Sequence, residues 1–152
     1  MSNQAFLSWL HREIPLTAAM QVSQVSFDGQ HLSLFAPLAA NVNDKGTGFA
    51  GSTSGLATLT GWCVITLWLD QLGIDADVMI ARSQIDYLSP QTDDLVTHVE
   101  LPSKQTMGEF KNSLLTKGRA RLPLVIKLGS TTSPNLILSG DYAARLRSAK
   151  GF

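Results

Sequence analysis

The sequence has 152 residues, enough for one domain with a substantial core. Twelve basic and twelve acidic side chains give a formal net charge of zero, which argues against a nucleic-acid-binding protein that relies on overall positive charge. Hydrophobic residues make up 44% of the chain, which argues against a disordered protein.

The first third of the chain is predicted to contain one helix and one hairpin. In chain order, the pattern of apolar residues predicts a helix over 3–13, strands over 21–27 and 31–37, and a loop over 39–49. Ile14-Pro15 is predicted to end the helix, because a residue that precedes proline disfavours the helical conformation. Asp28-Gly29, between the two strands, is typical of a tight hairpin.

The longest stretch without a charged residue runs from Gly46 to Leu69, and its 24 residues are long enough for a membrane span. Half of them are small or polar, however: five Gly, five Thr and two Ser. A helix buried inside a protein also lacks charge on all sides. We therefore predict no membrane span, but a buried helix from about residue 51 to 72 that is closed by Gly73.

The single cysteine, Cys63, lies within this predicted helix and cannot form a disulfide inside the chain. Its apolar neighbours indicate a packed core thiol rather than a nucleophile. The first residues lack the basic start and long apolar stretch of an export signal, so we expect a cytoplasmic location.

The second half of the chain is dominated by strand patterns. Strands are predicted over 77–88, 95–101, 118–128 and 136–146. The segment 107–117 is predicted to be helical, with a turn between longer strands as the alternative. No internal repeat or long linker divides the chain, so we expect a single domain over 1–152. Antiparallel strands wrapped around one helix suit this order, because a parallel α/β fold requires helices that alternate regularly with strands.

Charge is unevenly distributed along the chain. Residues 1–100 contain three basic and ten acidic side chains, whereas residues 101–152 contain nine basic and two acidic ones. This asymmetry suggests an anionic partner for the C-terminal third, either a phosphate-bearing molecule or an acidic protein. The alternative is a solvated sheet face whose Lys and Arg protect strand edges.

Three stretches resemble one group of hotdog-fold proteins, in which an antiparallel sheet wraps a central helix. They are Ala36–Ser52 (APLAANVNDKGTGFAGS), Leu59–Trp62 (LTGW) and Ala81–Pro90 (ARSQIDYLSP), with a weaker similarity in Gly118–Arg121 (GRAR). The group comprises thioesterase-like proteins, found alone or fused to an N-acetyltransferase domain, that are linked to malonyl-ACP decarboxylation in fatty-acid initiation. The resemblance implies an α+β hotdog fold with about five to six strands around one long central helix, in a stand-alone homodimeric protein.

The predicted loop leads into the N-terminus of the long helix, where unpaired N–H groups can bind a thioester carbonyl and stabilise negative charge. Hydrolysis needs an activated water, and hotdog thioesterases usually supply a carboxylate for it. Residues 46–69 contain neither an acid nor one of the three histidines, and the loop offers only Asp44. Decarboxylation of a malonyl thioester requires only neutral donors, because the leaving carboxylate provides the electrons of the enolate.

Asn43 is a neutral donor on this loop, and the resemblance identifies it as a catalytic residue. From composition alone, an Asn in a Gly-rich loop is more often a turn former. Ser52 and Thr53 are candidates for orienting the thioester or the carboxylate, with capping or packing of the helix as the alternative. Asp44 is the fourth catalytic candidate, with three alternatives. It repels the substrate carboxylate and so encourages its loss, it activates a water, or it pairs with Lys45 at the surface, which is the interpretation we favour.

Six residues are predicted to bind substrate: Phe49, Ala50, Gly51, Tyr87, Arg119 and Arg121. The two arginines belong to the basic C-terminal third, in which Arg119, Arg121, Arg145 and Arg147 are all candidates for steering or binding a phosphate-bearing partner. The substrate carries phosphopantetheine as an ACP or CoA thioester, and acidic acyl carrier protein is the partner expected for the basic C-terminal third. We expect no separate cofactor and no metal site, because the histidines are dispersed. The favoured function is decarboxylation of malonyl-ACP to acetyl-ACP and CO2; an acyl-CoA or acyl-ACP thioesterase and a non-catalytic acyl-carrier binding module are the alternatives.

Overall fold

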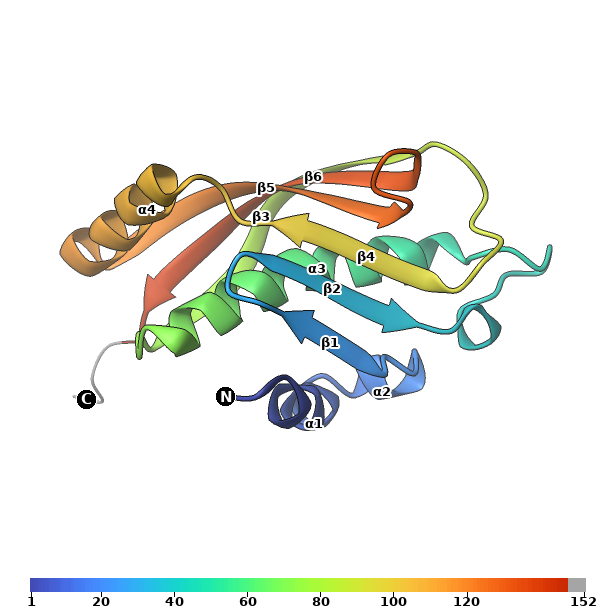
Figure 1. The fold of residues 1–152 in the computed structure, drawn as a ribbon, viewed down its shortest axis with the longest axis horizontal. Coiled ribbons are helices and arrows are strands. Elements are labelled where there is room, and N and C mark those ends of the chain that lie inside the picture. The colour runs from blue at the N-terminus through green and yellow to red at the C-terminus, as the bar shows by residue number, and fades with distance from the viewer. Residues whose placement is uncertain (148–152) are drawn as a thin grey trace.

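A sheet of six antiparallel strands curls around one long helix in the computed structural model, which describes residues 1–147 (Figure 1). The strands, in the order β1-β2-β4-β5-β6-β3 across the sheet, are β1 (Gln24–Phe27), β2 (His31–Ala36), β4 (Leu95–Glu100), β5 (Arg119–Gly129), β6 (Pro134–Leu146) and β3 (Ala76–Tyr87). The helices are α1 (Asn3–Glu13), α2 (Pro15–Ala19), α3 (Ala50–Gln71) and α4 (Lys104–Lys117), with a 3-10 turn at Leu38–Ala40. This architecture confirms the predicted fold. Lys150, one of the basic residues counted above, lies outside the described residues.

Some helices begin or end at other residues than predicted, because capping residues set their ends. Helix α4 begins at Lys104, earlier than predicted, because the Ser103 hydroxyl accepts a hydrogen bond of 3.2 Å from the Thr106 N–H. Gly118 ends α4 in the left-handed conformation, with φ at 73°. Pro15 does not only end α1: it is the first residue of α2, a position that proline favours.

The hairpin between β1 and β2 forms at the predicted Asp28-Gly29 step, with Gly29 at a φ of 99°. The Asp28 carboxylate accepts hydrogen bonds from the N–H groups of Gln30 (2.8 Å) and His31 (2.7 Å). These two donors stabilise the ionised carboxylate and lower the pKa of Asp28 from 3.8 to about 2.

We expect this hairpin to make the stability of the fold depend on acid. Because the folded pKa of Asp28 is depressed, its contribution is present above the ordinary pKa of 3.8 and is lost as the pH falls towards about 2. The urea midpoint of the parent should therefore fall between pH 5 and pH 2.5. In Asp28→Asn it should fall by less. Asp93→Asn, on the exposed chain between β3 and β4, is the control and should behave as the parent does. Equal acid sensitivity in Asp28→Asn and the parent would contradict this assignment.

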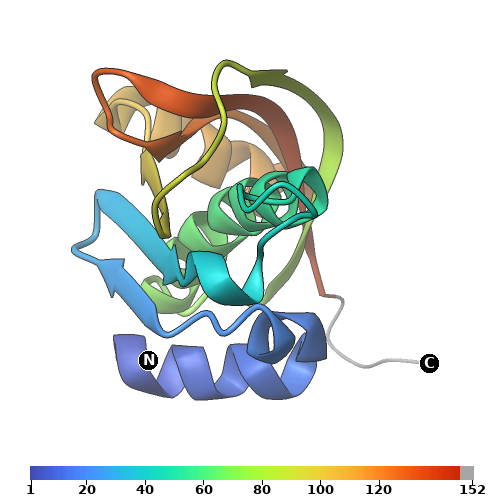
Figure 2. The same ribbon diagram turned by 90° about the vertical axis from the view of Figure 1, so that its right-hand side faces the viewer.

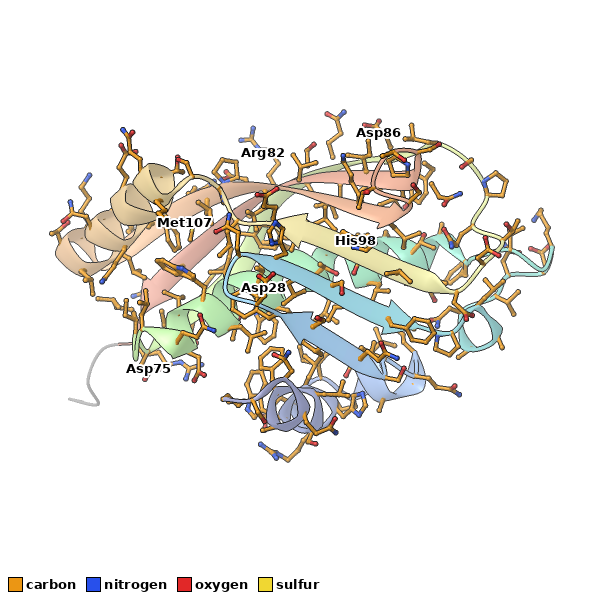
Figure 3. All side chains as sticks on the ribbon, in the orientation of Figure 1. Asp28, Asp75, Arg82, Asp86, His98 and Met107 are labelled. Atoms are coloured by element: carbon orange, nitrogen blue, oxygen red, sulfur yellow. The ribbon has the colours of Figure 1, made fainter. Side chains whose placement is uncertain are left out.

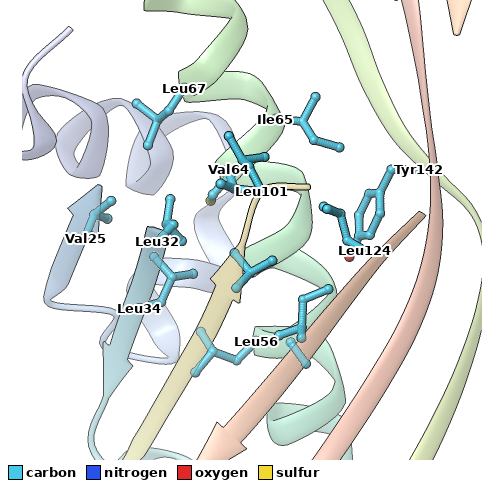
Figure 4. Close-up of a cluster of buried hydrophobic side chains, with 14 of the residues drawn as sticks. Val25, Leu32, Leu34, Leu56, Val64, Ile65, Leu67, Leu101, Leu124 and Tyr142 are labelled. Carbon is cyan, nitrogen blue, oxygen red and sulfur yellow. The ribbon is translucent and has the colours of Figure 1, made fainter. Parts of the chain in front are cut away.

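Helix α3 packs against five of the six strands, from β2 to β3, and supplies much of the core (Figure 4). It begins at Ala50 and ends at Gln71, one residue before each predicted bound. Cys63 is fully buried within it, and burial raises the pKa of its thiol, in agreement with the predicted core thiol. The helix is not enclosed on all sides, because Gly51 is exposed and Gly55 and Thr58 are half-buried. Within residues 1–147, no helix is long and apolar enough to cross a membrane.

Candidate functional site

The segment from Asn41 to Phe49 closes a tight loop just before α3, at the end of the molecule that faces the viewer in Figure 2. Its base is held by hydrogen bonds from the Phe49 N–H to the Asn41 carbonyl (2.8 Å) and from the Gly48 N–H to the Gln91 carbonyl (2.8 Å). A Cβ at position 48 would lie 2.9 Å from the Gln91 Cβ, so this approach of two backbones requires glycine.

Asn43 organises the interior of this loop. Its side-chain oxygen accepts hydrogen bonds from the N–H groups of Lys45 (2.9 Å) and Thr47 (3.1 Å), and its Nδ2 donates to the Thr47 hydroxyl (2.9 Å) and more weakly to the Gly48 carbonyl (3.5 Å). The side chain is half-buried, and its hydrogen bonds stay within the loop. Asn43 therefore fixes Thr47 and Gly48 directly, as a turn-forming asparagine does.

Helix α3 starts without a side-chain cap. Phe49 occupies the N-cap position, and its carbonyl accepts from the N–H groups of Ser52 and Thr53, both at 2.9 Å. The N–H groups of Ala50 and Gly51 have no acceptor within residues 1–147. The Phe49 ring folds back over Gly51, where a Cβ would collide with it. Two backbone donors at the positive end of the helix dipole are thus available to a ligand oxygen.

A pocket of about 340 Å³ opens beside this helix start, and every residue that lines it is uncharged. Its walls come from the loop, from the first turn of α3, from the last residue of β3 and the chain after it, from the end of β5 and from the start of β6. The lining residues are Thr47, Gly48, Ala50, Thr53, Tyr87, Leu88, Ser89, Pro90, Gln91, Leu128, Asn135 and Leu136. Thr53 is buried, and its hydroxyl donates to the Ala50 carbonyl at 3.2 Å. The pocket therefore offers neutral donors and no charged side chain of its own chain.

The sequence matches the family described as "Putative thioesterase (yiiD_Cterm)" over residues 3–146. The chain belongs to this family of hotdog-fold, thioesterase-like proteins. A solved structure described as a "putative thioesterase" from Shewanella oneidensis is 31% identical, with a TM-score of 0.81 over 95% of this chain and 96% of that one. The coarser part of the functional prediction, a thioesterase-like protein, is thereby confirmed.

Two more distant structures support the hotdog fold alone. A protein of unknown function from Chlorobaculum tepidum is 23% identical, with a TM-score of 0.89 over 95% of this chain and 94% of that chain. A thioesterase from Haemophilus influenzae is 10% identical, with a TM-score of 0.73 over 99% and 96%. The hotdog architecture thus persists among chains whose sequences share little.

The structure brings some of the predicted site residues of this hotdog protein to the pocket. Ala50, Thr53 and Tyr87 line it, while Phe49 and Gly51 lie beside it at the helix start. Their catalytic and binding roles stay predictions.

Three of the predicted polar residues lie near this site without lining the pocket: Asn43 within the loop, Ser52 on the first turn of α3, and Asp44 at the surface. The Asp44 carboxylate pairs with the Lys45 ammonium at 2.9 Å, and both side chains are largely exposed. This geometry agrees with the surface ion pair that we favoured for Asp44.

Arg119 and Arg121 lie far from the pocket of their own chain. They are at the start of β5, whereas Leu128 at its end lines the pocket, so Arg119 and Leu128 are about 30 Å apart at ~3.4 Å per strand residue. The Arg121 guanidinium donates to the Asp141 carboxylate at 2.8 Å. Within one chain these arginines and the pocket do not form one site.

Gln91 is a pocket residue that the sequence did not reveal. It is 6% exposed, and its Nε2 donates to the carbonyls of Asp93 (2.9 Å) and Asp94 (3.0 Å), which fixes the orientation of the amide. Its Oε1 has no hydrogen-bond partner among the described residues. Gln91 follows directly after the stretch Ala81–Pro90, but no spacing rule distinguishes it from any other polar loop residue.

A larger groove of about 670 Å³ lies on the outer surface of the sheet, beside β2, β4 and β5. His31 and His98 line it with Lys127, and Figure 3 labels His98 there. Partial burial lowers the pKa of His98, against a hydrogen bond to the Gly129 backbone that raises it. Because none of the loop or helix-start residues reaches this groove, it is separate from the candidate site.

Proposed function

We propose that the protein decarboxylates malonyl thioesters carried by acyl carrier protein, giving the acetyl thioester and CO2 in support of fatty-acid initiation. The observation that carries the proposal is the uncharged lining of the pocket beside the uncapped start of α3. A hydrolase needs a group that takes a proton from water, whereas decarboxylation needs donors for a developing oxyanion. Thioester chemistry in general is supported by the family.

The reaction follows from these donors. The bond between the α-carbon and the carboxylate breaks, CO2 leaves, and the electron pair moves into the thioester as an enolate. The N–H groups of Ala50 and Gly51 donate to the enolate oxygen, where they are worth more than in water. A proton delivered from water to the α-carbon then completes the acetyl group. In this scheme Thr53, which lines the pocket, orients the thioester, and Asn43 holds the loop that closes the pocket.

The same proposal includes a homodimer and a phosphopantetheine-bearing substrate. Strand β3 is an edge strand of 12 residues, and its Met79 and Tyr87 side chains are 45% and 57% exposed. One side of such a strand presents unpaired N–H and C=O groups, which a second copy of the strand can satisfy. The half-buried, uncharged face of α3 supports pairing at this edge, because it offers no charge to oppose burial.

A thioesterase that uses Asp44 to activate water is the second candidate, and it is supported by the family description. Mass spectrometry of the products from malonyl-ACP separates the two. We expect acetyl-ACP and CO2, and Asp44→Asn should keep this activity because Asp44 is exposed and paired with Lys45. Free malonate with holo-ACP from the parent, and the loss of both products in Asp44→Asn, would instead establish the hydrolase.

A further inference from the structure

The start of α3 has two sides with different surroundings. Ala50 and Thr53 lie on the side that lines the pocket. Gly51 lies on another side, together with Gly55 and Thr58, because residues at i, i+4 and i+7 share one face of a helix. The free N–H groups of Ala50 and Gly51 lie between these two sides, at the end of the helix.

The ring of Phe49 closes the side on which Gly51 lies. A Cβ at position 51 would collide with this ring, which supplies the three atoms nearest to it. The Cα–Cβ bond of a helical residue tilts towards the helix N-terminus, so a ring in this place lies at the end from which the free N–H groups project. The missing Cβ of Gly51 is therefore a slot that holds the Phe49 ring.

This slot, rather than the core, holds the ring in place. Phe49 is 54% exposed, and within residues 1–147 it belongs neither to the hydrophobic cluster nor to an aromatic pair. Its backbone is fixed, because its N–H donates to the Asn41 carbonyl and its carbonyl accepts from the N–H groups of Ser52 and Thr53. The side chain can thus be displaced or removed without a loss of core packing.

A mostly apolar cavity of about 210 Å³ lies further along the same face of α3. Its walls come from the second and third turns of α3, from Ile14, from Ile80 of β3 and from Tyr142 of β6, and none of its lining residues is charged. It begins at Gly55, one helical turn or about 6 Å from Gly51. The Phe49 ring therefore stands between the donors at the helix end and this cavity.

We propose that the Phe49 ring restricts the protein to short acyl groups, because it closes the path from the helix end to the cavity beside α3. The inference rests on the proposed thioester function and names its substrate class. With the carbonyl oxygen at the N–H groups of Ala50 and Gly51, the sulfur and its arm lie in the pocket and leave past the exposed side chains of Tyr87 and Leu88. The acyl group then points to the side of Gly51, where the ring blocks a longer chain.

Binding of stable analogues tests this role of Phe49 without any need for turnover. Calorimetry compares acetyl- and octanoyl-phosphopantetheine analogues in which a methylene group replaces the thioester sulfur. The readout is the ratio of the two affinities, which a general loss of binding leaves unchanged. We expect Phe49→Ala to shift this ratio towards the octanoyl analogue by about tenfold to a hundredfold, as extra methylene groups in an apolar pocket do. An unchanged ratio would overturn the proposal.

Two glycine-to-alanine variants on the same face of α3 test the slot itself. Gly51→Ala keeps the Phe49 ring but displaces it, so the affinity ratio should shift in the same direction as in Phe49→Ala, by a smaller factor. Gly55→Ala is the matched control, because a Cβ there meets no atom within 4 Å, and it should keep the parental ratio. A parental ratio in Gly51→Ala, or an equal shift in Gly55→Ala, would contradict the proposed action of the ring.

The double variant Phe49→Ala/Gly55→Phe tests where the longer chain lies. Its new ring fills the face of α3 between the helix end and the cavity, so the gain in affinity for the octanoyl analogue should be lost. If the double variant keeps the gain of Phe49→Ala, the chain does not enter this cavity and the proposed path is wrong.

The outcomes separate this inference from the function on which it rests. If the affinity ratio shifts as expected in Phe49→Ala and Gly51→Ala but malonyl-ACP yields no acetyl-ACP, the decarboxylase proposal fails and the role of Phe49 stands. If acetyl-ACP forms while Phe49→Ala keeps the parental ratio, the role of Phe49 fails and the decarboxylase stands.

Discussion

Replacement of Asn43 by alanine is expected to lower the rate of malonyl-ACP decarboxylation by about 10²–10³, because a displaced pocket wall and a lost oxyanion contact each cost a factor of this order. The side chain satisfies two backbone N–H groups of its loop and donates to the Thr47 hydroxyl. Its removal releases Thr47 and Gly48 from the pocket wall, whether or not the Asn43 amide itself also turns towards substrate. The measurement is kcat and KM with malonyl-ACP, alongside thermal unfolding to show that the variant folds.

Thr47→Val separates the two ways in which Asn43 can act. It removes the acceptor of the Asn43 Nδ2 but leaves the amide oxygen bonded to the backbone. If the Asn43 Nδ2 donates to the enolate, its release from Thr47 leaves the kcat of Thr47→Val at the parental value. If its bond to Thr47 instead shapes the pocket, the kcat of Thr47→Val falls as far as that of Asn43→Ala. A folded Asn43→Ala variant that decarboxylates at the parental rate would remove Asn43 from the mechanism altogether.

The features that the sequence could predict are those set by neighbours along the chain. The Asp28-Gly29 hairpin, the uncharged helix closed by Gly73 and the alternating strands each depend on local pattern, and each is present. The differences are also local in cause: Gln21 adopts a left-handed conformation with φ at 57°, so the first strand starts three residues later than predicted.

The parts of the site that escaped prediction depend on contacts between distant segments. Gln91 enters the pocket because its carbonyl binds the Gly48 N–H, 43 positions earlier, and no periodicity encodes that contact. The basic character of the C-terminal third is visible in the sequence, but which charges remain free is decided by strand register. Arg121 is compensated by Asp141, whereas Arg119 meets Arg145. These arginines are far from the pocket because they lie at the opposite ends of β5 and β6 from its lining residues.

Gly61 in α3 leaves no room for a side chain in the core. A Cβ there would collide with the ring and hydroxyl of Tyr142, a fully buried residue of β6. Movement of the Tyr142 ring away from position 61 would break a hydrogen bond, because its hydroxyl donates to the Thr58 carbonyl of α3 at 2.8 Å. Burial accordingly raises the pKa of Tyr142. Helix and sheet approach each other here only because position 61 lacks a Cβ.

Gly61→Ala is therefore expected to destabilise the protein by about 1–3 kcal/mol, the usual cost of overpacking a core. Helix propensity alone predicts the opposite sign, a gain of up to ~1 kcal/mol for Gly→Ala, so the direction of the change identifies which effect dominates. Gly108→Ala in α4 is the matched control: a Cβ there meets no atom within 4 Å, and this variant should be neutral or more stable than the parent.

Urea unfolding of Gly61→Ala, Tyr142→Leu and the double variant completes the test as a double-mutant cycle. The smaller side chain at position 142 makes room for the new methyl group, so the double variant should be more stable than the sum of the two single losses predicts. Strict additivity, or a Gly61→Ala variant as stable as Gly108→Ala, would show that the contact with Tyr142 does not set the distance between α3 and β6. Since α3 carries the N–H groups of Ala50 and Gly51 towards the pocket, that distance also positions the donors on which the proposed chemistry depends.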